Sequence, residues 1–293
     1  MFREKNTEIQ QLLELQKEQL EQQRKNWNQY SAGWAKWDDL IMETMRPVGD
    51  ALVDSLRITG NEKVLDVASG TGEPGLSLGS LLPGGQVTGT DLSEKMVAIA
   101  NQNSQKRGIA NYRSLVSDAS SLPFDDRSFD HAISRFGIMF FPDIEKGLKE
   151  MTRVLKKGGQ ISVAVWAAPQ LNPFITVMAS TIMSRLNLPK PPADAPGIFR
   201  CAEPGYTRRL MHNAGLVDVS EYSLNGNAEF ESPEQYWEVM SDVAGPLMKA
   251  LEQQPADVVS MVRHAVMEEA GKYQLNGTVK TGWEALIVTG RVN

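Results

Sequence analysis

Short apolar runs alternate with stretches of helical period between about residue 62 and residue 166. Apolar runs rich in β-branched residues predict strands, and the stretches between them predict helices. This alternation is typical of a doubly wound α/β fold, in which helices cover both faces of a parallel sheet. The predicted strands are Lys63–Val67, Gln86–Thr90, Tyr112–Val116, Asp130–Ser134 and Gln160–Trp166, and the predicted helices span residues 74–82, 93–107 and 143–155.

The pattern is less regular outside this core. The remaining predicted elements are a helix at Tyr206–Asn213 and strands at Val217–Leu224 and Glu284–Gly290. Two further segments interrupt the domain, and we expect them to form lid insertions beside a binding site. The predicted organisation is an N-terminal helical segment at 1–45 and a main domain at 46–293, with the insertions at about 167–200 and 232–275.

The N-terminal segment is rich in Gln, Glu and Lys and carries a helical stripe of apolar residues, Ile9, Leu12, Leu13 and Leu20. This pattern predicts a solvated helix that packs on the body of the protein. A helix pair that joins two copies into a homodimer is the alternative, although the stripe is short for a coiled coil.

Composition argues against several classes of protein. A net charge of −6, without a run of Lys and Arg, disfavours a nucleic-acid partner. The longest apolar stretch, Ile161–Ala168, is far shorter than the roughly 20 residues of a membrane span. The single Cys201 and the polar N-terminal residues favour the cytoplasm. None of the three histidines has metal-ligand spacing, so we expect no metal site.

A glycine-rich turn follows the first predicted strand, in the sequence Asp66-Val-Ala-Ser-Gly-Thr-Gly72-Glu-Pro74-Gly75. Glycines allow close approach of the backbone to a ligand, and the helix that begins near Pro74 offers unpaired N–H groups. Ligands of open α/β sheets bind at this carboxyl edge. The turn also matches the GxGxxG pattern of nicotinamide-dependent oxidoreductases, which is weak support for that alternative.

Acidic residues end three successive predicted strands, and their spacing indicates the ligand. Asp91, about twenty residues after the turn, is placed to accept hydrogen bonds from ribose hydroxyls; Ser93 then predicts a helix N-cap with Met96 one turn in. Asp66 suits an ammonium group better than a pyrophosphate, which disfavours a dinucleotide. Asp118 could accept from an adenine amino group. An adenosine with a cationic tail has these properties, and S-adenosylmethionine fits them.

The same residues resemble class I S-adenosylmethionine-dependent methyltransferases, nearest to the branch that contains ubiquinone and menaquinone biosynthesis C-methyltransferases. The resemblance covers residues 60–168 and departs from the family at Ala68, which stands in place of the first glycine of the turn. The ordered motifs are Asp66 to Gly72, Asp91, Asp118-Ala119, Leu122 to Asp130 and Arg153 to Gly159.

The resemblance implies a Rossmann-like seven-stranded sheet in the order 3-2-1-4-5-7-6, mostly parallel with an antiparallel last strand. It implies S-adenosylmethionine as cofactor and S-adenosylhomocysteine as product. Asp66 and Gly70 would lie at the methionine moiety, and Arg135 would reach the cofactor carboxylate or an acidic substrate group, with a structural ion pair as the alternative. The residues expected to line the cofactor are Asp66, Ala68, Ser69, Gly70, Gly72, Asp91 and Leu92 at the ribose, Met96, Asp118 and Ala119 at the adenine, and Arg135.

The predicted reaction is in-line methyl transfer to carbon, oxygen or nitrogen of a small apolar or aromatic acceptor. Use of the cofactor without net methylation, as a binding protein or another enzyme, is the alternative. A nucleic-acid methyltransferase is disfavoured because Ser134-Arg-Phe-Gly follows the fourth strand in place of an Asn/Asp-Pro-Pro-aromatic motif. No catalytic base can be named, and His264 is a weak candidate. The candidate acceptor-binding residues, for which core packing is the alternative, are Tyr30, Trp34, Trp37, Phe136, Met139 and Phe174.

Overall fold

The computed structural model describes residues 2–192 and 194–293, with the side chains of residues 2–13 and Pro246 outside that description. One mixed sheet runs through the molecule in the strand order β3-β2-β1-β4-β5-β8-β6, and a short β7 pairs with β8. Strands β3, β2, β1, β4 and β5 pair in parallel, whereas β8 is antiparallel to both β5 and β6. The order expected from the resemblance is confirmed, with β8 in the place of the seventh strand.

The strands and helices of the first half have nearly the predicted bounds, except that β5 begins at Leu155, five residues before the predicted start at Gln160. The ligand edge is therefore built from elements that the local pattern identifies. They are β1 (Lys63–Val67), α3 (Gly75–Leu81), β2 (Gln86–Asp91), α4 (Glu94–Arg107), β3 (Tyr112–Val116), β4 (Phe129–Arg135), the 3₁₀ helix η1 (Ile138–Phe140), α5 (Ile144–Val154) and β5 (Leu155–Trp166).

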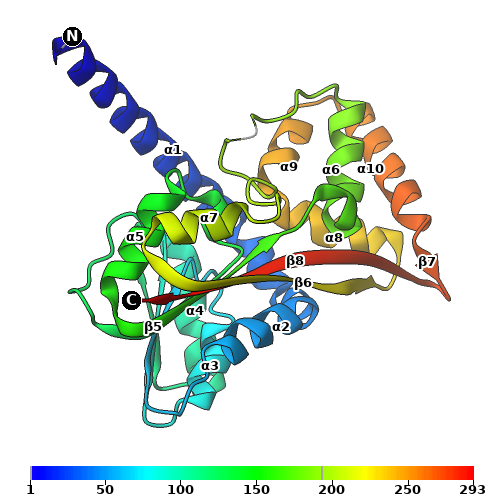
Figure 1. The fold of residues 1–293 in the computed structure, drawn as a ribbon. Helices are drawn as coiled ribbons and strands as arrows, with labels where there is room; N and C mark the ends of the chain where they lie inside the picture. The colour runs from blue at the N-terminus through cyan, green and yellow to red at the C-terminus, as the bar shows by residue number, and fades with distance from the viewer. Residues whose placement is uncertain (1, 193) are drawn as a thin grey trace.

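The second half differs from the prediction in the length of its strands. Both β6 and β8 are 15 residues long and continue well beyond the predicted segments. In Figure 1 their far ends run beneath the group of helices α6, α8 and α10. The elements are η2 (Pro169–Leu171), α6 (Pro173–Arg185), α7 (Tyr206–Asn213), β6 (Leu216–Phe230), α8 (Pro233–Val243), α9 (Gly245–Glu252), α10 (Ala256–Gly271), β7 (Gln274–Leu275) and β8 (Thr278–Val292).

Two long helices precede the sheet, α1 (Phe2–Lys36) and α2 (Asp38–Ser55). The N-terminal part of α1 extends away from the body, as Figure 1 shows, while its second half contacts α4, α8 and α9. Helix α2 buries Val48 and Leu52 against the sheet and runs through residue 45, where we placed a domain boundary. That boundary stays a prediction.

The homodimer that we kept as an alternative to a solvated helix also stays a hypothesis. Of its apolar stripe, the side chains of Ile9, Leu12 and Leu13 lie outside the described residues, and Leu20 is partly exposed. Among the described helices, none combines the length and the hydropathy that a membrane crossing requires.

Candidate active site

The turn between β1 and α3, at the carboxyl edge of the sheet, contains three residues in the left-handed backbone conformation. Ala68, Gly70 and Gly72 have φ angles of 59°, 52° and 116°, the left-handed region that glycine tolerates best. The Ser69 N–H donates to the Thr90 carbonyl at 2.9 Å, so the turn is attached to β2. A β-carbon at Gly70 would meet nothing within 4 Å, which leaves room above the turn.

Asp91, at the end of β2, links this turn to the next helix. Its Oδ2 accepts from the Gly70 N–H and its Oδ1 from the Ser93 N–H, both at 2.9 Å. Each carboxylate oxygen has a second lone pair, so both can accept a further hydrogen bond. The Ser93 hydroxyl accepts from the Met96 N–H at 3.1 Å, which confirms the predicted N-cap of α4. Leu92, between them, is half-buried.

Asp66 is fully buried in β1 below the turn. Its Oδ2 accepts from the Gly75 N–H at 3.1 Å, and a β-carbon at Gly75 would lie 2.7 Å from that oxygen, so only glycine fits there. Its Oδ1 has no hydrogen-bond partner among the described residues. Burial raises the pKa of Asp66 to about 8, although the charge of Arg135 opposes this. A buried carboxylate with a free oxygen is costly unless a ligand satisfies it.

Arg135 ends β4 beside this carboxylate. Its Nη2 lies 2.8 Å from the Met42 sulfur, which is a weak acceptor. Burial lowers the pKa of Arg135, while the charges of Glu73, Asp66 and Asp38 raise it. Among the described side chains no carboxylate lies within ion-pair distance of the guanidinium, so the structural ion pair that we kept as an alternative is not formed there.

The third acid lies beside the other two strand ends. Asp118 follows β3 and is half-buried, and its two oxygens accept from the Ser120 N–H at 2.8 Å and the Ser120 hydroxyl at 2.6 Å. The Ser117 N–H donates to the Asp91 carbonyl at 2.9 Å. Ala119 is half-buried next to it. The topology therefore brings all three predicted acids to one edge.

Polar side chains of α1 and α2 form hydrogen bonds with residues at this edge, and these contacts were not predicted from the sequence. Asn28 Oδ1 accepts from the Ser93 hydroxyl at 2.6 Å. Asp38, in the first turn of α2, accepts from the Thr71 hydroxyl at 2.6 Å and from the Asn103 amide at 3.3 Å. Burial raises the pKa of Asp38. Acidic residues mark helix N-termini in sequence, but nothing local indicates which loop they meet.

The aromatic residues of α1 lie between this edge and the helices α8 and α9. The Trp27 ring meets Phe140 of η1 edge-on, with centroids 5.2 Å apart, and Trp34 lies 6.2 Å from Trp27. The Tyr30 ring packs closely on the backbone of Gly245 at the start of α9. The hydroxyl of Tyr30 and the indole N–H of Trp34 are buried without a hydrogen-bond partner among the described residues.

Trp37 joins the same segment to α8, because its indole N–H donates to Asp242 at 2.8 Å. Lys36 donates to the same carboxylate at 2.8 Å. Gly33 permits this contact: a β-carbon there would collide with the Asp242 carbonyl. Residues 27–38, which we call the cap segment, therefore contact both the ligand edge and the helices α8 and α9.

The remaining acceptor candidates differ in exposure. Phe136, after β4, is half-buried and stacks on Trp166 with centroids 3.9 Å apart. Phe174 lies beyond it, 6.2 Å from Trp166, and is only 8% exposed. Met139 is 1% exposed. The structure gives Met139 and Phe174 the environment of core residues, and their contact with an acceptor stays a prediction.

Comparison with known proteins gives this geometry a family. Residues 65–163 match the model of a methyltransferase domain. Over 113 residues, 39% of this chain and 51% of the relative, the chain is 40% identical to a demethylmenaquinone methyltransferase of Thermus thermophilus. The chain is a class I S-adenosylmethionine-dependent methyltransferase.

Two further likenesses extend over most of the methyltransferase. An uncharacterised protein of Mycobacterium tuberculosis is 28% identical over 265 residues, which is 89% of this chain and 93% of the relative. The crystal structure of YcgJ from Bacillus subtilis is 18% identical, has a TM-score of 0.55, and aligns over 84% of this chain and 98% of its own. The second likeness concerns the fold alone.

The residues present at the edge of the methyltransferase fit its cofactor. Among the described residues, Oδ1 of Asp66 has no partner and suits an ammonium group, and the guanidinium of Arg135 forms no ion pair and suits a carboxylate. The open space over Gly70 and the spare lone pairs of Asp91 suit a ribose. These groups thus match the charged amino-acid group and the ribose of S-adenosylmethionine.

Another motif of the family has a structural role in the methyltransferase. Arg153 of α5 donates to the carbonyls of Phe124 at 2.8 Å and Leu122 at 3.1 Å, and it pairs with Glu150. These contacts hold the loop between β3 and β4 against α5. The motif therefore supports the sheet and does not reach the ligand edge.

The histidines of the methyltransferase are not gathered near the three acids. His264 is exposed on α10, which contacts α6, α8 and β8 and buries Val262 and Val266. His131 is half-buried in β4, where Nδ1 accepts from the Gln160 N–H at 3.2 Å and burial lowers its pKa. His212 is exposed in the last turn of α7. A catalytic role for His264 stays a weak prediction.

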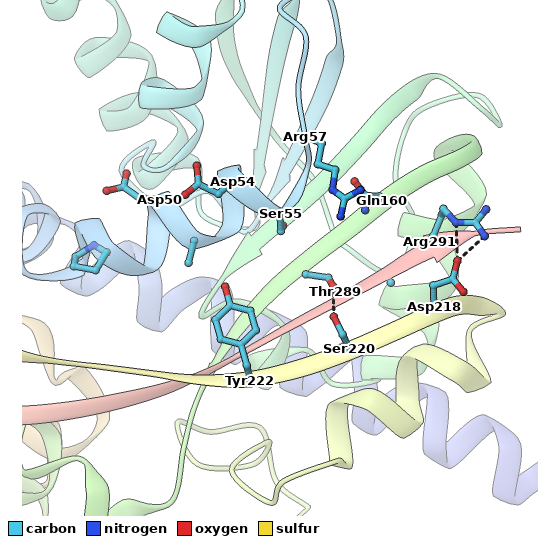
Figure 2. A pocket seen from close by; sticks show the side chains of 13 residues that line it. Asp50, Asp54, Ser55, Arg57, Gln160, Asp218, Ser220, Tyr222, Thr289 and Arg291 are labelled. Atoms are coloured by element: carbon cyan, nitrogen blue, oxygen red, sulfur yellow. Dashed lines mark hydrogen bonds and ion pairs between the residues drawn. The ribbon is translucent and has the colours of Figure 1, made fainter.

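An open cleft of about 740 Å³ lies elsewhere, between α2 and the strands β5, β6 and β8. Figure 2 shows Asp54 on one side and Tyr222 on the other, with the Arg291–Asp218 ion pair and the Ser220–Thr289 hydrogen bond at its floor. Its β5 residue, Gln160, lies well before the carboxyl end of that strand. Ligands of such sheets bind at the carboxyl edge, so this cleft is not the cofactor site.

Proposed function

We propose that the protein transfers the methyl group of S-adenosylmethionine to a small apolar or aromatic molecule in the cytoplasm. The observation that carries this proposal is the buried Asp66, with one free oxygen, beside the unpaired Arg135 at the edge that also holds Asp91. The aromatic residues of the cap segment, of which Trp27 packs edge-on against Phe140 of η1, support an apolar acceptor.

The proposed cofactor contacts follow the charges of the site. Asp66 would bind the ammonium group of the methionine moiety, and Arg135 its carboxylate. Asp91 would accept from the two ribose hydroxyls while it keeps its bonds to Gly70 and Ser93. Asp118 would accept from the adenine amino group. The turn residues Ala68, Ser69, Gly70 and Gly72, with Leu92, Met96 and Ala119, would pack around the cofactor.

The protein's part in the reaction is alignment and exclusion of water. The bound sulfonium supplies an electrophilic methyl group and a good leaving group. Two turns would then set the positions of the reactants. The cofactor would lie on the turn between β1 and α3, and the acceptor would lie beside Phe136, on the turn after β4. Tyr30, Trp34 and Trp37 would cover the acceptor and keep the site dry, and rings near a sulfonium also attract its charge.

Release of S-adenosylhomocysteine tests this proposal. The protein is incubated with labelled S-adenosylmethionine and a panel of phenols, quinols and aromatic amines, and product and labelled acceptor are quantified together. We expect stoichiometric formation of both with at least one class of acceptor, and none with Asp91→Asn. Tight binding of S-adenosylmethionine that is returned unchanged with every acceptor would favour the alternative, a protein that uses the cofactor without methyl transfer.

A further inference from the structure

Two residues other than glycine adopt the left-handed conformation at the ligand edge, one on each of the turns that would hold the reactants. Ala68, after β1, has a φ of 59°, and Phe136, after β4, has a φ of 58°. Each costs on the order of 1–2 kcal/mol relative to ordinary backbone. Strained residues persist only where surrounding contacts hold them, and such contacts are present here.

Each of the two turns is fastened to its own side of the sheet. The turn after β1, which we call the cofactor turn, is held by a hydrogen bond from the Ser69 N–H to the Thr90 carbonyl of β2. The turn after β4, which we call the acceptor turn, is held by a hydrogen bond of 2.9 Å from the Phe136 N–H to the Ala164 carbonyl of β5. The stacking of Phe136 on Trp166 holds it as well. The relative position of the two turns is therefore decided where they meet.

They meet at Ala68 and Gly137. A β-carbon at position 137 would lie 2.5 Å from the methyl carbon of Ala68 and 2.7 Å from the Ser134 hydroxyl oxygen. Real β-carbons do not approach other atoms so closely, so position 137 accepts only glycine while alanine occupies position 68. Ser134 is fully buried and its hydroxyl has no hydrogen-bond partner among the described residues, so no hydrogen bond there holds this second obstacle in place.

We propose that Ala68 and Gly137 are a complementary pair that locks the cofactor turn onto the acceptor turn and so sets the alignment of methyl donor and acceptor. This rests on the proposed function. The methyl group of Ala68 fills the space that Gly137 leaves, and this contact compensates the left-handed strain at position 68. Both are positioning residues: they act through the turns that carry Ser69, Gly70, Arg135 and Phe136.

The pair explains the departure of this chain from its family. Most members have glycine at position 68, where the left-handed conformation costs nothing. Alanine there becomes acceptable only with a residue lacking a side chain at position 137. The two positions should therefore tolerate substitution together and resist it singly.

A double-mutant cycle tests the pair. The variants are Gly137→Ala, Ala68→Gly, the double variant, and the double variant with Ser134→Ala, which also removes the second obstacle. Affinity for S-adenosylmethionine is measured by calorimetric titration, and thermal unfolding is measured without ligand. We expect Gly137→Ala to weaken binding about tenfold or more, and the triple variant to return to within about threefold of the native protein.

Gly147→Ala is the matched control. A β-carbon at Gly147 would lie 2.6 Å from the ring of Phe141, away from both turns, so this variant is also destabilised by a steric clash. Ala68→Gly should not restore its midpoint of unfolding. The proposed pair would be overturned if Gly137→Ala had the same affinity for S-adenosylmethionine and the same midpoint of unfolding with and without Ala68→Gly and Ser134→Ala.

The cycle separates this inference from the proposed function. Failure of the native protein to bind S-adenosylmethionine would count against the proposed function, while the unfolding midpoints would still report the coupling of positions 68 and 137. Normal binding by the native protein, combined with additive effects of the substitutions, would reject the pair alone.

Discussion

The ligand edge and the cap segment both contribute to the proposed site, but they are built in different ways. At the edge, Asp66, Asp91 and Asp118 lie at or just after the ends of three strands, and parallel pairing brings strand ends together. In the cap segment, Asn28 and Asp38 reach the edge only because α1 and α2 fold back over it. Topology alone positions the first set, whereas tertiary packing positions the second.

This comparison implies that the edge supplies most of the cofactor affinity. Replacement of Asp91 by Ala removes the proposed acceptor of both ribose hydroxyls and the partner of the Gly70 and Ser93 N–H groups. We expect affinity for S-adenosylmethionine to fall by about 100-fold or more, close to 3 kcal/mol. Calorimetric titration measures it, and Asp130→Asn, a remote change in the same half, is the control. A loss below about fivefold would show that the edge does not dominate.

The cap should contribute less, through closure over the edge. Asp38→Ala removes the acceptor of the Thr71 hydroxyl and the Asn103 amide, and we expect about tenfold weaker binding of S-adenosylmethionine. Asp39→Ala is a closely matched control, since Asp39 also lies in the first turn of α2 but is exposed. Equal losses in the two variants would mean that only the charge at the helix terminus matters.

The sequence predicts these two regions unequally for the same reason. The strand ends, the N-cap at Ser93 and the left-handed glycines depend on neighbouring residues, so local pattern identifies them. The contacts of Asn28 lie 65 residues away along the chain, and no local signal specifies them. The extended part of β6 was missed because residues such as Asn225 and Asn227 are poor strand formers and are kept in place by pairing with β8.

The pH dependence of stability should distinguish the buried Asp66 at the ligand edge from exposed acidic residues. The pKa of Asp66 is raised to about 8, above that of the unfolded chain. Between about pH 4 and pH 8 the native state therefore holds a proton that the unfolded state releases, and stability without ligand falls as pH rises, by about 1 kcal/mol per pH unit near pH 6–7. Unfolding in urea at several pH values measures this slope. Asp66→Asn should remove it, and an identical slope in that variant would contradict the assignment.

The smallest effect on stability and cofactor affinity is expected where the cap segment contacts α8. Trp37→Phe removes the hydrogen bond to Asp242 and reduces the ring that lies under Lys36, while Asp242 keeps its contact with Lys36. We expect less than about 1 kcal/mol of lost stability, faster amide hydrogen exchange in α8, and a change below about twofold in affinity for S-adenosylmethionine. Unchanged exchange in α8, or a large loss of cofactor affinity, would contradict the separation of the two regions.

The most direct test of the central claim is a calorimetric titration of the native protein with S-adenosylmethionine, with NAD titrated in parallel. The acids at the three strand ends, and the free oxygen of Asp66 in particular, predict one site with a dissociation constant on the order of micromolar and no heat with NAD. Binding of NAD, or no binding of S-adenosylmethionine at millimolar concentration, would contradict the account.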